Sequence, residues 1–333
     1  MCFHFPLPDC SVRLVSGALF VEYFFMLTGY FALSRLRRTG EGTEGILPYM
    51  GRFYLRVLPF VVVGTGFEYA SKLLAAYPDW GEMARKALLF PFEILLLQST
   101  NVYQPVYHVL WYLSVVLVCL PVVMYAYRRF PNVWCYVAVV GAILCYGYLM
   151  QTVGTLRVNR DIVNTCLRAF GGMLSGGVVM ILSDRLRSRK VGRGGRIALL
   201  AVEIICMVVA VTLMCQTDME RTQYDSVTVL FLLSSLAISL SGQTMTARIP
   251  STKLTGWLAS VSLAVYCLHY GVIDLMTEVT HAELDNGLTV FGWVLTLAVA
   301  VTVVTGVRLA GRRRNRRDVD LRVASQRGDS ASS

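Results

Sequence analysis

The chain has 333 residues, of which 55% are hydrophobic and 16% are charged, and it carries a net charge of +10. Soluble domains average roughly 45–50% apolar and about 25% charged residues, so this composition points to lipid. It excludes a disordered chain, a disulfide scaffold and a soluble α/β enzyme. The nine cysteines lack C-x-x-C spacing and lie mostly in apolar runs, which favours buried side chains over disulfides or metal ligands, so we assign no metal site.

Apolar runs long enough to cross a bilayer recur along the chain. A span needs about 20 helical residues, because a helix rises 1.5 Å per residue through a core about 30 Å thick. We expect nine spans, at residues 14–34, 53–73, 107–127, 133–151, 165–183, 197–215, 226–242, 257–277 and 288–310. A further apolar stretch, 87–97, is too short and contains Pro91 and Glu93, so we expect it to be re-entrant or interfacial. The sequence therefore predicts an all-α, polytopic transmembrane helix bundle.

The lysines and arginines indicate the orientation of this bundle. If the gap at 35–52 faces the cytoplasm, the cytoplasmic gaps and the tail hold 22 Lys and Arg, whereas the outer gaps and outer helix ends hold 8. Because basic loops stay inside, we expect a multi-pass protein of the plasma membrane with a cytoplasmic C-terminus. The same bias accounts for the positive net charge, so we expect no nucleic-acid partner.

The two ends of the chain differ in character. We expect residues 1–310 to form the membrane domain and residues 311–333 to form a disordered basic tail that touches anionic lipid headgroups. Nine spans with a cytoplasmic tail place Met1 outside, and MCFHFPLP reads like the end of a broken helix. We therefore expect that the domain is truncated and that a further span precedes Met1.

Four segments, in order, resemble motifs of one family. GALFVEYFFMLTGYF at 17–31 is similar to a "G-x-D-x-F-F-x-L-S-G-F" span, and RFYLRVLP at 52–59 to an "R-R-x-x-R-x-x-P" motif. HVLWYLS at 108–114 is similar to "H-x-x-W-x-L", and VSLAVYCLHY at 261–270 to "S-Y-x-x-Y-L-x-H". In this order they resemble the integral membrane acyltransferase family 3, whose members modify bacterial surface glycans.

The resemblance implies an O-acyltransferase that moves an acyl group, commonly acetyl, from acyl-CoA to a hydroxyl of a cell-surface carbohydrate. It also implies a bacterial source. The family signature Arg-x10-His places His4 as the catalytic base, with its arginine upstream of Met1. Histidine suits this role because its pKa lies near neutral pH. A solvated terminal histidine is the alternative for His4.

Glu22 takes the acidic position of the family in the middle of a span, where an ionisable side chain faces a cavity or a partner. It is expected either to orient His4 or contact the acceptor, or else to form a structural pair with an intramembrane Arg or His. Arg52 and Arg56 are four residues apart on one helix face and could clamp the phosphates of CoA, although plain anchoring would also explain them.

Three further residues are expected to bind the acceptor. His108 and Trp111 lie on one helix face near the outer leaflet, where a tryptophan can stack on a sugar ring, although an interfacial aromatic belt would also hold Trp111. His269 is a second polar candidate, with a packed histidine as the alternative.

Other functions stay open from the sequence. A secondary transporter or flippase could use the buried acids as proton or cation sites, and the chain could also be an inactive truncated relative. The glycines at 171, 172, 176 and 177 indicate helix packing, because a phosphate loop would need a following Lys-Ser/Thr and a preceding strand.

Overall fold

The computed structural model describes residues 16–39, 45–157, 161–216, 223–246, 252–281 and 284–331, all in helices and their connections. The α-helices in these ranges are α1 (Phe20–Thr39), α2 (Ile46–Ala76), α3 (Trp80–Ile94), α4 (Trp111–Arg129), α5 (Trp134–Thr152), α6 (Ile162–Ser188), α7 (Arg193–Gln216), α8 (Gln223–Leu240), α9 (Lys253–Thr280) and α10 (Asn286–Ala331). Short 3₁₀ turns are η1 (Gly17–Leu19), η2 (His108–Leu110) and η3 (Pro131–Val133).

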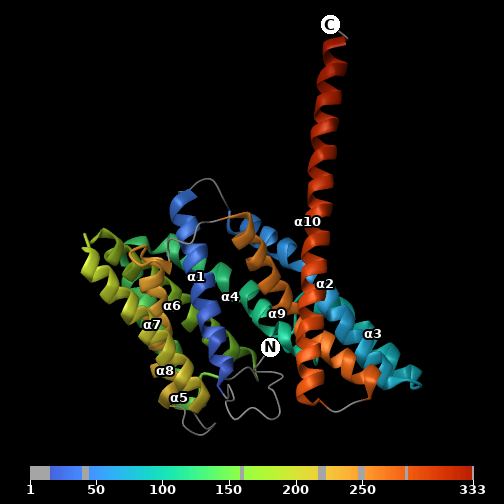
Figure 1. The fold of residues 1–333 in the computed structure, drawn as a ribbon, viewed down its shortest axis with the longest axis horizontal. Helices are drawn as coiled ribbons and strands as arrows, with labels where there is room; N and C mark the ends of the chain where they lie inside the picture. The colour runs from blue at the N-terminus through green and yellow to red at the C-terminus, as the bar shows by residue number, and fades with distance from the viewer. Residues whose placement is uncertain are drawn as a thin grey trace.

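The nine expected spans all coincide with helices. Eight of the described helices are long and apolar enough to cross a membrane, and the ninth expected span falls on α8, which is apolar over Tyr224–Leu240. Omitting α3, successive helices run in alternating directions, so the C-terminal ends of α1, α4, α6, α8 and α10 share one end of the bundle (Figure 1). We call this the basic end, since Arg37, Arg187 and Arg308 lie there, and we call the other the α3 end.

The helices form two packing groups that α4 joins. One buried apolar cluster combines residues of α1 and α4 to α8, and a second combines residues of α2, α4, α9 and α10. α4 supplies Val116 and Cys119 to the first cluster and Leu113 to the second. α4 therefore packs against both groups, and the loop that precedes it comes from α3.

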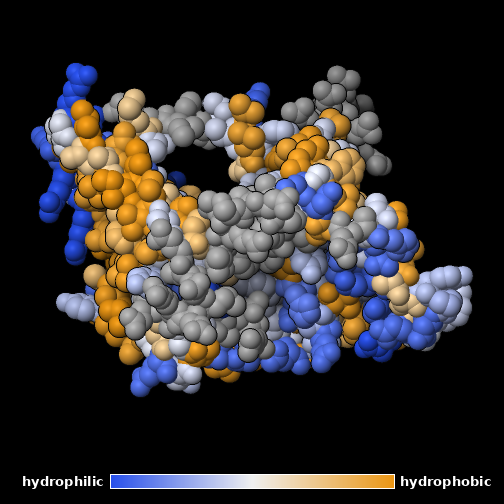
Figure 2. Space-filling view, turned by 60° about the horizontal axis from the view of Figure 1, so that its bottom comes forward, coloured by the Kyte–Doolittle hydropathy of each residue, from blue (hydrophilic) through white to orange (hydrophobic). Residues whose placement is uncertain are grey.

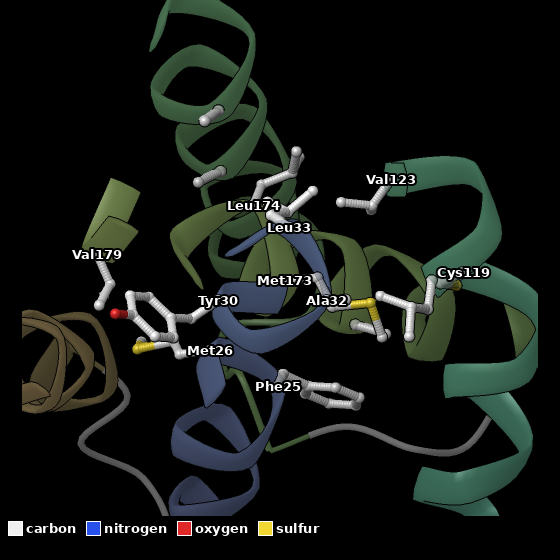
Figure 3. Packing of buried hydrophobic residues seen from close by; sticks show 14 of the residues in the cluster. Phe25, Met26, Tyr30, Ala32, Leu33, Cys119, Val123, Met173, Leu174 and Val179 are labelled. Atoms are coloured by element: carbon white, nitrogen blue, oxygen red, sulfur yellow. The ribbon is translucent and has the colours of Figure 1, made fainter. Parts of the chain in front are cut away.

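Glycines allow α1 and α6 to cross closely, as the sequence predicted for the 171–177 segment. A Cβ at Gly176 would lie 2.3 Å from the carbonyl oxygen of Met26, and a Cβ at Gly29 would lie 2.3 Å from that of Met173. Figure 3 shows side chains of both helices beside α4 at this crossing. Such backbone contact fixes the relative position of residues one or two turns away, which include Glu22 and Arg168.

α3 is too short to cross a bilayer, and the expectation of a non-crossing segment is confirmed. The Asp79 carboxylate caps its first turn by accepting the Glu82 N–H at 3.0 Å. Its N-terminal turns carry charged residues, and Figure 2 shows a hydrophilic surface at this end of the molecule, whereas broad hydrophobic areas cover the bundle flank. Its C-terminal end is anchored instead by the buried Glu93.

The basic segment lies in a helix in this structure, and the disorder expected for residues 311–333 stays a prediction. α10 continues through the basic segment to Ala331. The physical reason is intrinsic propensity, because arginine, leucine, alanine and glutamine favour helix and glycine and proline are absent between 312 and 327.

Candidate active site

A buried ion pair lies between α1 and α6 near the α3 end. The Arg168 Nε lies 2.5 Å from Glu22 Oε1, and neither side chain is more than 1% exposed. Arg168 also donates from Nη2 to the Ala18 carbonyl at 2.8 Å, and the Tyr146 hydroxyl donates to Glu22 Oε2 at 2.5 Å. Both oxygens of the carboxylate therefore have donors, as a charge removed from water requires.

This arrangement identifies the partner of Glu22. The sequence left open a pair with an intramembrane arginine or histidine, and the structure provides Arg168 as the arginine. Arg168 comes to this point because Asp161 caps α6 and the glycine crossing brings α6 against α1. The sequence interpretation missed Arg168, which was counted only as a basic residue at an outer helix end, although an arginine among apolar residues of an expected span was a usable signal.

Trp111 connects the ion pair to a cavity. The Arg168 guanidinium carbon lies 5.2 Å from the Trp111 ring centroid, which is cation–π range. The ring also makes an edge contact with Phe25 at 6.1 Å. Three contacts of different kinds thus hold Arg168, and its charge in turn orients the indole.

The cavity has a volume of about 380 Å³. It is lined by Gln98, Ser99, Asn101, Pro105, His108, Trp111, Asp161 and Thr165. The structure therefore brings together His108 and Trp111, as the sequence predicted, and it adds amide, hydroxyl and carboxylate groups from the 95–107 loop and from the start of α6. An aromatic face with several hydrogen-bonding groups suits a polar ligand that also has an apolar face.

Two lining residues also organise the backbone of α6. Asp161 is its N-cap, with Oδ1 accepting the Asn164 N–H at 2.8 Å, and the Thr165 hydroxyl donates to the Asp161 carbonyl at 2.6 Å. The Asp161 carboxylate is half-buried at the cavity wall. Sequence reasoning gave these two residues no role, because nothing local marks a helix cap as part of a cavity.

His269 does not line this cavity. It is 3% exposed on α9, and its Nδ1 lies 2.9 Å from the Tyr266 carbonyl and 3.1 Å from that of Val265 in its own helix. The Tyr266 side chain extends from α9 to η2, since its hydroxyl donates to the Val109 carbonyl at 2.5 Å. The geometry corresponds to the packed, hydrogen-bonded alternative for His269.

Arg52 and Arg56 lie at the opposite, basic end, exposed on α2. A second cavity of about 690 Å³ at this end is lined by Arg193 and Arg196 of α7 with Gln243 and apolar side chains. His4, the expected base, lies outside the described residues.

Comparison with known proteins adds one finding. A family model described as an acyltransferase domain matches residues 3–307. No curated protein and no solved structure matches the chain.

Proposed function

Because the chain belongs to the integral membrane acyltransferase family 3, we propose that it transfers an acyl group, acetyl in the first instance, from acyl-CoA to a hydroxyl of a cell-surface carbohydrate. The observation that carries the acceptor assignment is the polar cavity beside Trp111, over the Glu22–Arg168 pair. The protein would lie in the cytoplasmic membrane of a bacterium, with its C-terminus in the cytoplasm.

The cavity is suited to a sugar ring. The Trp111 indole offers an apolar face, while Gln98, Asn101 and Asp161 offer acceptors and donors for hydroxyl groups. The cavity volume of about 380 Å³ is at the small end of ligand sites, which suits one or two sugar units of a longer glycan. The Glu22–Arg168 pair would hold the indole in place without touching the sugar.

The proposed reaction needs a base near this cavity. An imidazole nitrogen of His4 would take the proton from the sugar hydroxyl, and the oxygen would attack the thioester carbonyl carbon. The C–S bond would then break, and the CoA sulfur would leave as a thiol with the proton that the imidazole returns. His108, which lines the cavity, would contact the acceptor.

The diphosphate of CoA would bind at the basic end, and the acyl group would reach into the bundle toward the acceptor cavity. Arg52 and Arg56 present two guanidinium groups one helical turn apart, a spacing that suits the diphosphate of CoA. The orientation predicted by the loop charges puts this end in the cytoplasm, where acyl-CoA is found, and places the anionic lipid headgroups near the same arginines.

The test measures radiolabelled acetyl transfer from acetyl-CoA in membrane vesicles that contain the whole protein, with a panel of purified polysaccharides as acceptors. Trp111→Ala should reduce transfer at least ten-fold, the scale of a lost stacking contact, whereas Trp80→Ala, on the exposed first turn of α3, should not change it. His4→Ala should abolish transfer. Equal activity of the Trp111 and Trp80 variants would refute the acceptor site.

The donor assignment has its own comparison. Arg52→Ala with Arg56→Ala should raise the KM for acetyl-CoA and leave the acceptor KM unchanged. Arg128→Ala with Arg129→Ala changes two arginines at the same end of the bundle and serves as the control. If only changes at Arg193 and Arg196 raise the donor KM, the donor binds in the cavity at the start of α7 instead.

A further inference from the structure

The segment between α3 and η2 forms one wall of the cavity. Gln98, Ser99, Asn101 and Pro105 all come from this 95–107 loop. Its backbone is specific, because Leu96 has a φ of 57° and Asn101 has a φ of 56°, in the left-handed region that side chains rarely adopt. A loop with this shape needs contacts that hold it, because its own residues do not prefer the conformation.

Glu93 supplies these contacts at both ends of the loop. Its Oε1 accepts the backbone N–H of Val106 at 2.6 Å and that of Tyr107 at 3.2 Å, and its Oε2 accepts Gln98 Nε2 at 2.8 Å. The same Gln98 nitrogen donates to the Glu93 carbonyl at 2.9 Å. One carboxylate thus joins residue 98, near the start of the loop, to residues 106 and 107 at its end.

The Glu93 side chain is fully buried, with an exposure of 0%, and it forms no salt bridge within the part of the chain that the structure describes. Its partners in hydrogen bonds are neutral donors. A buried carboxylate held only by neutral donors is unusual, because a hydrophobic side chain of similar size would avoid the desolvation. What the carboxylate provides, and an apolar side chain cannot, is a defined position for three donors of the loop.

A second anchor holds the middle of the loop. The Ser99 hydroxyl donates to the Trp111 carbonyl at 3.0 Å, and the Ser99 N–H donates to the Ser114 hydroxyl at 3.1 Å. These bonds fix the position of the loop relative to the first turn of α4. Glu93 and Ser99 therefore fix the Gln98 and Asn101 side chains relative to the Trp111 ring.

Burial raises the pKa of the Glu93 carboxyl, against the hydrogen bonds from Tyr107, Gln98 and Val106 that lower it. The titratable groups that face it are Glu68 and Tyr69 of α2 and Tyr103 and Tyr107 of the loop. The Glu93 carboxylate also raises the pKa of the nearby Tyr103 hydroxyl, in addition to the larger effect of burial.

We propose that Glu93 is a positioning residue for the acceptor, which clamps the 95–107 loop at both ends and so sets the shape of the sugar-binding cavity. It touches neither donor nor acceptor. This inference rests on the proposed function, but the clamp itself is a property of the loop and can be measured without activity.

The test combines kinetics with hydrogen exchange on the whole protein in membrane vesicles. Glu93→Gln should raise the acceptor KM about ten-fold, the effect of one or two lost hydrogen bonds, and leave kcat and the KM for acetyl-CoA within about two-fold. In the same variant, the amides of Val106 and Tyr107 should exchange faster. Glu93→Asp, which keeps the charge on a shorter side chain, should restore part of both effects.

Glu82→Gln is the matched control, because Glu82 also lies on α3 but pairs with Arg85 on the surface. It should change neither measurement. Glu93→Gln with an unchanged acceptor KM and unchanged exchange would refute the clamp. Faster exchange in a protein that transfers acetyl to no carbohydrate would keep the clamp and refute the proposed function.

Discussion

Removal of Arg168 tests the buried pair at the centre of the candidate site. Arg168→Met keeps most of the side-chain volume, but it leaves the fully buried Glu22 carboxylate with a neutral donor, the Tyr146 hydroxyl, in place of the guanidinium charge. Breaking one side of a buried pair costs about 3–5 kcal/mol, because the other charge stays uncompensated away from water. The exposed Arg37–Asp184 pair, with side chains 43% and 33% exposed, offers the contrast. Exposed pairs contribute about 0–1 kcal/mol.

The assay is thermal unfolding of the purified protein in detergent. For a chain of this size, 1 kcal/mol corresponds to roughly 2 °C in Tm, so Arg168→Met should lower Tm by about 6–10 °C and Asp184→Asn by no more than about 2 °C. Glu22→Gln combined with Arg168→Met removes both charges and should recover a large part of the loss. Equal Tm values for Arg168→Met and Asp184→Asn would refute the reasoning, and so would a double variant in which the two losses simply add.

Three more predictions concern other regions. Gly176→Ala should lower the free energy of unfolding by about 1–3 kcal/mol, the cost of overpacking, because its Cβ would lie 2.3 Å from the Met26 carbonyl oxygen. Gly147→Ala, whose Cβ would have no neighbouring atom within 4 Å, should be neutral or stabilising in the same unfolding assay. A cysteine at Ser188, exposed at the basic end, should react with an impermeant thiol reagent only after cells are opened, and labelling of intact cells would overturn the orientation. The acceptor KM should rise as the pH falls through the raised pKa of Glu93, and Glu93→Gln should lack this acid limb. The pKa of Glu93 is higher in the folded protein than in the unfolded chain, so the wild type should lose stability as the pH rises from the unfolded to the folded value. Unfolding measured against pH should show this loss in the wild type and not in Glu93→Gln.

The sequence by itself determined the membrane-spanning helices and their order. Hydropathy is a local property, and bilayer thickness fixes the length that it must cover, so the spans at 107–127 and 165–183 could be placed without any neighbour. The glycines at 172 and 176 likewise predicted close helix packing, since two helix backbones can touch where a residue has no side chain. Motif order also identified the family, which the match over residues 3–307 confirms.

Only the tertiary structure decided which residues share a site. Glu22 and Arg168 are 146 positions apart, and their contact depends on how α1 crosses α6 rather than on either local sequence. The contact between Trp111 and Arg168 likewise depends on how the helices pack. The shape of the 95–107 loop depends on buried hydrogen bonds to Glu93, which no periodic pattern in the sequence encodes. His269 shows the converse, since its motif suggested a site residue, whereas helix packing turned its ring toward carbonyl groups of its own helix.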